Sequence, residues 1–117
     1  MPFNIMSWHW VARRLMREEG IRILKRDQFR CRYCGLDGRA SFENALVMGV
    51  DFVIPRAKKG RKSEDNLVAC CRPCNTLKGH RVFKDFDEAK RHVLKCREEL
   101  RKSWELSETE QRSAATA

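Results

Sequence analysis

No stretch of the 117-residue sequence approaches the roughly 20 consecutive apolar residues that a membrane span requires. Residues 1–11 are interrupted by polar side chains and have no basic residue ahead of them, so they do not resemble a signal peptide. Internal repeats, a flexible interdomain linker, a glycine-rich phosphate loop and a Ser-His-Asp set are also missing. These absences disfavour a membrane protein, a protease and a nucleotide-triphosphate enzyme, and they predict a cytoplasmic location.

Hydrophobic residues make up 42% of the chain and charged residues 35%, which permits a modest core. The length fits one domain, and we expect it to span residues 1–106. Residues 107–117 are rich in Ser, Thr, Glu, Gln and Ala and are expected to form a disordered tail. In the cytoplasm thiols stay reduced, so the six cysteines point to metal binding before disulfides.

The net charge of +9 and the sequence pI of about 9.6 are typical of a protein with a nucleic-acid partner. The excess is concentrated in residues 51–84, which carry nine basic and three acidic residues, while residues 1–30 carry seven and three. Charge runs are often only solvated faces. Because this one overlaps a cysteine motif, phosphate binding is the favoured interpretation.

The spacing of apolar residues and the positions of capping residues and glycines predict a mixture of helices and strands. Ser7 can cap a helix from Trp8 to about Glu19 that stops at Gly20, and a second short helix is expected over residues 21–26. Residues 46–54 and 67–69 resemble paired strands, and the segment after Cys74 begins a helix cut by Gly79. A long final helix, capped by Asp85 or Asp87, has an apolar stripe at helical spacing. The members of that stripe are Phe86, Ala89, Val93, Cys96 and Leu100.

Two Cys-x-x-Cys pairs, Cys31 with Cys34 and Cys71 with Cys74, are separated by 36 residues. Two such pairs in a cytoplasmic chain indicate a four-thiolate site, and zinc prefers tetrahedral sulfur ligation. An iron–sulfur cluster is the alternative. A filled four-cysteine site has no open position, so its expected role is structural. We expect Cys70 to be a small buried residue and Cys96 to pack in the core.

The order of motifs resembles the HNH endonuclease family over about half of the chain. The matching blocks are Arg26-Asp27-x-Phe29-x-Cys31-x-Tyr33-Cys34-Gly35, Val50-Asp51-Phe52-Val53-Ile54-Pro55-Arg56, Asp65-Asn66-Leu67-Val68, Cys71-Arg72-Pro73-Cys74-Asn75 and Lys78-Gly79-His80-Arg81. The resemblance implies a ββα-metal fold in which a hairpin and a helix hold one divalent cation, magnesium or manganese, over a scissile phosphate. In the subgroup with paired knuckles, a zinc ion braces the hairpin.

The resemblance also implies roles for individual residues. Asp51 and Asn75 fall where the family has ligands of the catalytic metal. Asn66 falls where a family asparagine holds the loop and orients the general base, and His80 lies near the end of the motif, where a His or Asn is sometimes found. Taken without the family, Asp51 could instead form a salt bridge, Asn75 could cap a helix, Asn66 could be a turn residue and His80 could simply be exposed.

One position departs from the family pattern. The family carries histidine directly after the aspartate, and that histidine activates the attacking water, whereas this chain has Phe52. Phenylalanine cannot accept a proton, and a positioned general base contributes about 10²–10⁴-fold to rate. Either another group such as His80 takes the proton, or the domain has lost cleavage and binds nucleic acid only.

The sequence therefore predicts a small α+β domain with a zinc-braced, HNH-like ββα-metal centre between an N-terminal helix and a long C-terminal helix. The leading function is metal-dependent hydrolysis of DNA. The alternatives are a catalytically inactive zinc-dependent nucleic-acid-binding protein and a protein-interaction zinc module. Basic residues near the hairpin are expected to contact the phosphates of the DNA backbone, largely independently of the DNA sequence. These are Arg56, Lys58, Lys59, Arg72, Lys78 and Arg81.

Overall fold

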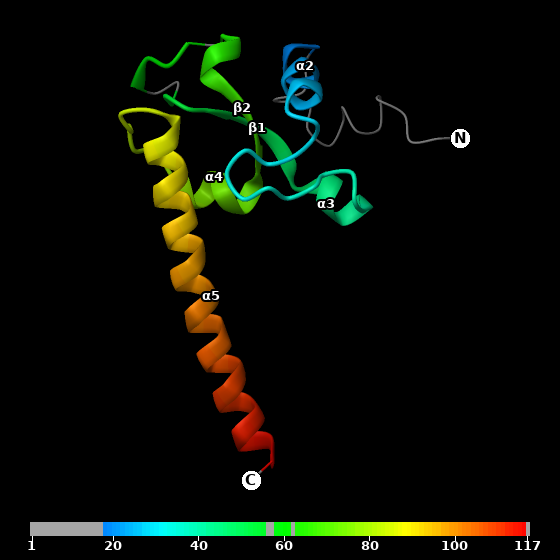
Figure 1. Cartoon of the computed structure of the whole chain (residues 1–117), viewed down its shortest axis with the longest axis vertical. Helices are drawn as coiled ribbons and strands as arrows, with labels where there is room; N and C mark the ends of the chain where they lie inside the picture. The colour runs from blue at the N-terminus through cyan, green and yellow to red at the C-terminus, as the bar shows by residue number, and fades with distance from the viewer. Residues whose placement is uncertain (1–17, 56–57, 62, 117) are drawn as a thin grey trace, which may run out of the picture.

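The computed structural model describes residues 18–55, 58–61 and 63–116 (Figure 1). Most of the helix expected over residues 8–19, and Arg56, therefore lie outside the described residues. The elements in chain order are α2 (Glu18–Arg26), α3 (Phe42–Leu46), β1 (Met48–Phe52), the 3₁₀ turn η2 (Glu64–Asn66), β2 (Leu67–Cys71), α4 (Arg72–Lys78) and α5 (Phe86–Thr116). A two-stranded hairpin followed by a helix and a long C-terminal helix confirms the predicted α+β, HNH-like fold.

The hairpin lies at the centre of the fold. β1 and β2 pair antiparallel, with Met48 opposite Cys71 and Phe52 opposite Leu67. Every residue of β2 is buried, because α2 and α4 both pack against the hairpin. A strand covered on both faces is expected to be apolar throughout, as Leu-Val-Ala-Cys-Cys is. The buried core consists of Ile23, Leu24, Cys31, Tyr33, Met48, Val50, Leu67, Val68, Ala69, Cys70, Cys71, Cys74, Phe83, Ala89 and Val93.

Asp27 joins the end of α2 to the second strand. Its side chain is only 4% exposed, and its Oδ2 accepts a hydrogen bond from the Ala69 backbone N–H at 2.8 Å. Arg26 and Arg32 flank the same carboxylate at 2.9 and 3.3 Å. Burial alone would raise the pKa of Asp27, but the bonds from Arg26 and Ala69 outweigh burial and hold that pKa below its ordinary value. The motif residues that precede the first cysteine pair therefore attach α2 to the sheet.

Capping residues fix where the two helices after the hairpin begin and end. Pro73 lies in the first turn of α4, where its missing N–H costs nothing, and Gly79 ends α4 with a φ of +66°. Asp85 is the cap of α5, since its Oδ1 accepts from the Glu88 N–H at 2.8 Å. Although α5 is long, none of the helices in the described part has both the length and the apolar character needed to cross a bilayer.

Three boundaries differ from the sequence-based expectation. Gly20 does not stop a helix but lies buried inside α2, where close packing compensates for its low helix propensity. The first strand is shorter than residues 46–54, because Leu46 ends α3 and bends follow Phe52. Residues 107–116 are helical, as a continuation of α5, and do not form the disordered tail that their composition predicts. Six of these ten residues are Ala, Glu, Gln or Arg, which are good helix formers.

Candidate functional site

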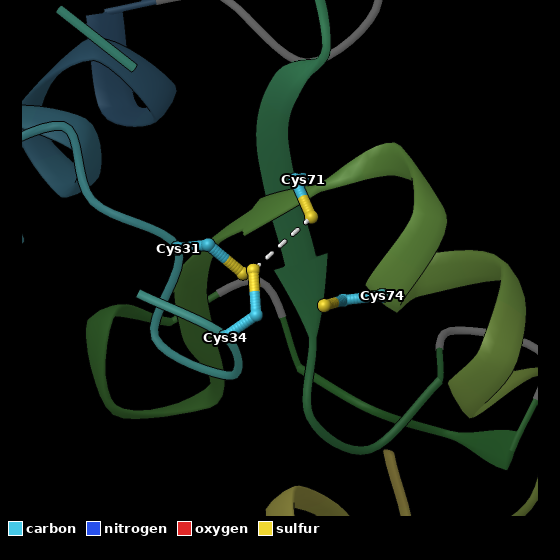
Figure 2. Close-up of side chains that lie close together, drawn as sticks. All are labelled: Cys31, Cys34, Cys71 and Cys74. Atoms are coloured by element: carbon cyan, nitrogen blue, oxygen red, sulfur yellow. Dashed lines mark hydrogen bonds between the residues drawn. The ribbon is translucent and has the colours of Figure 1, made fainter. Parts of the chain in front are cut away.

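Four cysteines gather where the hairpin meets α4. Cys31 and Cys34 lie on the loop after α2, Cys71 ends β2, and Cys74 lies in the first turn of α4 (Figure 2). The four Sγ atoms all lie within 4.8 Å of one another, and those of Cys34 and Cys71 are 3.7 Å apart. A tetrahedral zinc with Zn–S bonds of about 2.3 Å requires sulfurs separated by about 3.8 Å. The predicted grouping is confirmed, and the geometry is suited to a metal ion.

Backbone hydrogen bonds shape the first knuckle. The N–H of Gly35 donates to the Cys31 carbonyl and the N–H of Cys31 donates to the Leu36 carbonyl, both at 2.9 Å. Gly35 has a φ of +81°, a conformation that glycine adopts without strain. The N–H of Arg32 donates to the Ala69 carbonyl at 2.9 Å, which attaches the knuckle to β2. The pair of thiols is thus held in place by the fold itself.

The adjacent cysteine, Cys70, lies outside the metal-binding group. It is buried, and its thiol donates to the carbonyl of Cys71 at 3.2 Å. This confirms the expectation that Cys70 is a small buried residue. Cys96, expected in the core, is partly buried on α5, with its Sγ 3.6 Å from Nε2 of His92.

Charge within the sulfur cluster is stabilised from two sides. Hydrogen bonds from Cys70, Cys71 and Cys74 lower the pKa of the Cys31 thiol, and bonding to Cys31 raises the pKa of Cys74. On α5, Nη1 of Arg97 lies 3.6 Å from Sγ of Cys74. Burial lowers the pKa of Arg97, but the sulfurs of Cys34 and Cys74 outweigh burial and leave it above its usual value. The long helix therefore places a cation against the thiolates.

Asp51 is held by two side chains, those of Tyr33 and Lys78. It is 6% exposed, and its Oδ2 accepts a hydrogen bond from the Tyr33 hydroxyl at 2.7 Å. Nζ of Lys78 lies 3.4 Å from the same oxygen and donates to the Phe52 carbonyl at 3.0 Å. Burial raises the pKa of Asp51, while Tyr33 and Lys78 act in the opposite direction. Burial, together with the charge of Asp51, also raises the pKa of Tyr33, so that phenol remains a hydrogen-bond donor.

This network bears on whether Asp51 can hold a divalent cation. The contacts that Tyr33 and Lys78 make with the carboxylate both use Oδ2. A carboxylate whose second oxygen is fixed by neighbours is the usual design of an oriented metal ligand. Asn75, one turn before Lys78 on α4, is exposed and offers an amide oxygen. The donor types fit Mg²⁺ or Mn²⁺, while the ammonium of Lys78 already balances part of the Asp51 charge.

Asn66 holds the loop between the strands. Its Oδ1 accepts from the Ile54 N–H at 2.8 Å, and its Nδ2 donates to the carbonyls of Ile54 at 3.1 Å and Arg61 at 2.8 Å. Gly60 packs so tightly against Ile54 that a Cβ would lie 1.7 Å from the Ile54 carbonyl oxygen. The contacts of Asn66 are those expected of a loop-holding asparagine.

The structure places no imidazole against Asp51 among the residues that it describes. His80 is exposed beyond the end of α4. His92 lies on α5, where Nδ1 is 3.4 Å from Nη1 of Arg81. Phe52, half-buried at the end of β1, occupies the position next to Asp51. Among the described residues, therefore, no histidine is positioned beside Asp51 to act as a general base.

The predicted phosphate-binding residues separate into two groups. Exposed ones are Lys58 and Lys59 on the loop, Arg72 on α4 and Arg81 after it. Lys78 is different, because it is 1% exposed and its ammonium is occupied by Asp51 and Phe52. A role for Lys78 in contacting phosphate does not fit this burial. A groove of about 780 Å³ lies beside the loop, and its basic lining residues are Arg26, Arg32, Lys59, Arg61 and Lys84.

Three side chains that shape the site escape prediction from the sequence. Tyr33, between the first two cysteines, has no role in the sequence-based interpretation, yet it bonds Asp51. Lys78 is predicted on the surface but lies in the interior. Arg97 on α5 reaches Cys74, although nothing in its local sequence marks it. The only signal in the sequence was Asp51 itself, since a carboxylate among apolar residues requires a partner.

Residues Lys78 and Asp51 should be energetically coupled. Lys78→Met leaves a buried carboxylate without its cation, and breaking a buried pair in this way costs about 3–5 kcal/mol of unfolding free energy. Lys84→Met, at an exposed lysine, is the matched control and should change stability by less than about 0.5 kcal/mol. In an Asp51→Asn background the cost of Lys78→Met should fall, as a double-mutant cycle in denaturant would show. Equal losses for Lys78→Met and Lys84→Met would contradict the coupling.

The segment that contains the cysteine pairs and the hairpin was compared with known protein families and structures. Residues 31–81 match the family model described as HNH endonuclease. Neither the curated proteins nor the solved structures include a match to the chain. The matched segment contains both cysteine pairs, the hairpin and α4. The resemblance seen in the sequence is thereby confirmed: residues 31–81 match the HNH endonuclease family model and contain four cysteines positioned to hold a metal ion.

Proposed function

We propose that the protein is a metal-dependent endonuclease that hydrolyses phosphodiester bonds in DNA, at a low rate. The observation that carries the proposal is Asp51, a carboxylate oriented through Oδ2 by Tyr33 and Lys78 inside the segment that matches the HNH family. The low rate follows from Phe52, which supplies no proton acceptor where the family has histidine. A cytoplasmic setting would keep the cysteines reduced.

Two metals belong to this proposal. Zinc, held by Cys31, Cys34, Cys71 and Cys74, is structural, because four thiolates leave no open coordination position. Magnesium or manganese would be held by Asp51 and Asn75, and when bound it would acidify water and stabilise charge on the phosphate. The chain's own part is to orient Asp51 through Tyr33 and Lys78 and to keep the loop in place through Asn66.

The DNA contacts follow from the exposed cations around the hairpin. Lys58, Lys59 and Arg61 lie on the loop that Asn66 holds, Arg72 begins α4, and Arg81 follows α4. Arg56 belongs to the same predicted set but lies outside the described residues. Such side chains neutralise phosphates and release counterions, which gives affinity without base recognition.

A second candidate function has its own support. Phe52 lacks a proton acceptor, and Lys78 places an internal cation against Asp51 where a catalytic metal would bring a second positive charge. If these features exclude the divalent cation, the domain is a zinc-dependent nucleic-acid-binding protein without cleavage. A nicking assay on supercoiled plasmid with magnesium or manganese separates the two functions. The zinc-loaded protein in buffer without added magnesium or manganese is the blank.

Binding to duplex DNA should weaken steeply as salt is added. Changing Lys58, Lys59 and Arg61 together to Glu should weaken binding to every duplex sequence. The slope of log K against log salt should fall by about one for each phosphate that these side chains no longer neutralise. The matched control reverses Arg91, Lys95 and Lys102, which are exposed on α5 and change the net charge equally. Fluorescence anisotropy with two unrelated duplexes measures both effects. Equal weakening in the two triple variants would mean that only net charge matters.

A further inference from the structure

The four cysteines of the metal site differ in their access to solvent. Cys31, Cys71 and Cys74 are 2%, 1% and 0% exposed, whereas Cys34 is only partly buried. On the side of α5, Nη1 of Arg97 lies against Sγ of Cys74 at 3.6 Å. A reagent that approaches the sulfur cluster from solvent therefore meets Cys34 first.

A groove between α4 and α5 leads to Cys34. Its volume is about 950 Å³, and its apolar walls include Pro73, Leu77 and Leu94. Of the four grouped cysteines, Cys34 is the one that lines this groove. The groove thus provides a route from solvent to one sulfur of the metal site.

The charges along the groove favour an uncharged reagent. Two of its three arginines are already engaged, Arg97 by Cys74, and Arg101 by Glu98 and Glu105 of its own helix. An anion would have to compete with these partners. A small neutral molecule enters without disturbing them.

Sulfur chemistry indicates which small molecule reacts here. A metal-bound cysteine is a thiolate, and the thiolate is the form that attacks electrophiles and oxidants. Cysteines that respond to oxidants are accessible thiolates with a second cysteine nearby, which completes a disulfide. Cys34 meets both conditions, because its Sγ lies 3.7 Å from Sγ of Cys71 (Figure 2).

We propose that hydrogen peroxide oxidises the metal site at Cys34 and that this oxidation releases zinc. The Cys34 thiolate attacks one peroxide oxygen, so that an S–O bond forms, the O–O bond breaks and hydroxide leaves. The Cys71 thiolate then attacks the sulfur of this sulfenic acid, and the S–S bond forms as the S–O bond breaks and a second hydroxide leaves. Two electrons pass from the two thiolates to the peroxide. Cys31 and Cys74 remain, which are too few ligands for a four-coordinate structural zinc.

Release of zinc makes the folded state dependent on the redox conditions. The metal site connects the loop after α2 to the end of β2 and to α4, so its loss separates these segments. A reductant regenerates both thiolates, and added zinc then restores the site. The proposal rests on the four-cysteine metal site and does not depend on whether the protein cleaves DNA.

The first test uses the full-length, zinc-loaded chain. Limiting N-ethylmaleimide, followed by peptide mass spectrometry, should initially label Cys34 at least about tenfold faster than the three buried ligands. After treatment with hydrogen peroxide, a zinc-binding dye should report one zinc released for each Cys34–Cys71 disulfide found by peptide mapping. A phosphine reductant together with zinc should then restore the far-UV circular dichroism.

Two variants separate Cys34 from Cys96, the other partly exposed cysteine. Cys34→His keeps a zinc ligand, as in sites with three cysteines and one histidine, but removes the accessible thiolate. At equal peroxide concentration it should lose zinc at least about tenfold more slowly than the wild type, because the remaining ligands are buried. Cys96→Ser is the matched control and should lose zinc at the wild-type rate.

Several results would overturn the proposal. Zinc that the wild type retains in peroxide, a first disulfide that lacks Cys34, or one that joins Cys34 to a cysteine other than Cys71 would each do so. Equal zinc loss from the wild type and from zinc-loaded Cys34→His would also contradict it. If Cys34→His does not load zinc, the labelling order and the disulfide map of the wild type decide. A wild-type chain that binds no zinc overturns the metal site as well, whereas zinc retained in peroxide overturns this inference alone.

Discussion

Cys71→Ser is expected to abolish both metal binding and the folded state. The four sulfurs lie within 4.8 Å of one another and connect the loop after α2 to the end of β2 and to α4. Structural zinc contributes about 10–16 kcal/mol in small domains, which exceeds or equals the total stability of most domains of this size. We expect one zinc per wild-type chain, and loss of helical circular dichroism when a strong chelator removes it.

The neighbouring cysteines supply controls for this experiment. Cys70→Ser can keep the hydrogen bond to the Cys71 carbonyl, and Cys96 contacts His92 on α5 and is not one of the four grouped cysteines. Both serine variants should retain stoichiometric zinc, as measured by inductively coupled plasma mass spectrometry. Stoichiometric metal in the Cys71 variant, or its loss in the Cys70 variant, would show that the ligand set has been assigned incorrectly.

The second large effect is expected from Phe52→His. If Asp51 and Asn75 hold a divalent cation, an imidazole beside Asp51 supplies the missing proton acceptor, and cleavage should rise by at least about 10²-fold with magnesium or manganese. Adding Asp51→Asn to this variant should remove the gain, because the metal loses its carboxylate while Tyr33 keeps an acceptor. Single-turnover nicking of supercoiled plasmid measures the rates, with melting temperature and zinc content as checks on folding.

Two further variants, Phe52→Tyr and His80→Ala, are the controls for the cleavage rate of Phe52→His. Tyrosine at position 52 keeps the aromatic volume without a base of suitable pKa, so it should stay as slow as the wild type. Efficient cleavage by the wild type that His80→Ala destroys would mean that His80 is the base and that Phe52 only packs. An inert Phe52→His variant with intact fold and zinc would support the second candidate function, DNA binding without cleavage.

Short sequence patterns predicted much of this structure. The predictions that were wrong or missing concern contacts between residues that are far apart in the sequence. Cysteine spacing predicted which four cysteines lie together, because each Cys-x-x-Cys pair can be recognised from its own short stretch of sequence. Asp51 required a partner, but whether that partner was a metal or a salt bridge depended on Lys78, 27 residues away. A lysine in a short polar helix is ordinarily exposed. Its burial could be seen only when α4 was placed against β1. The prediction that a helix stops at Gly20 was wrong for the same reason, since tertiary packing overrides helix propensity.

The three side-chain hydrogen bonds of Asn66 have a consequence for the kinetics of DNA association. They bridge Ile54 and Arg61, so these two residues, which flank Lys58 and Lys59, are already fixed in the free protein. Ordering a flexible residue costs about 1–2 kcal/mol in conformational entropy. For these residues that entropy is lost when the protein folds and not when it binds DNA. Encounter with DNA then needs no rearrangement at Ile54 or Arg61. The association rate should be set by diffusion and electrostatic attraction, and Asn66 should influence how long the complex lasts more than how fast it forms.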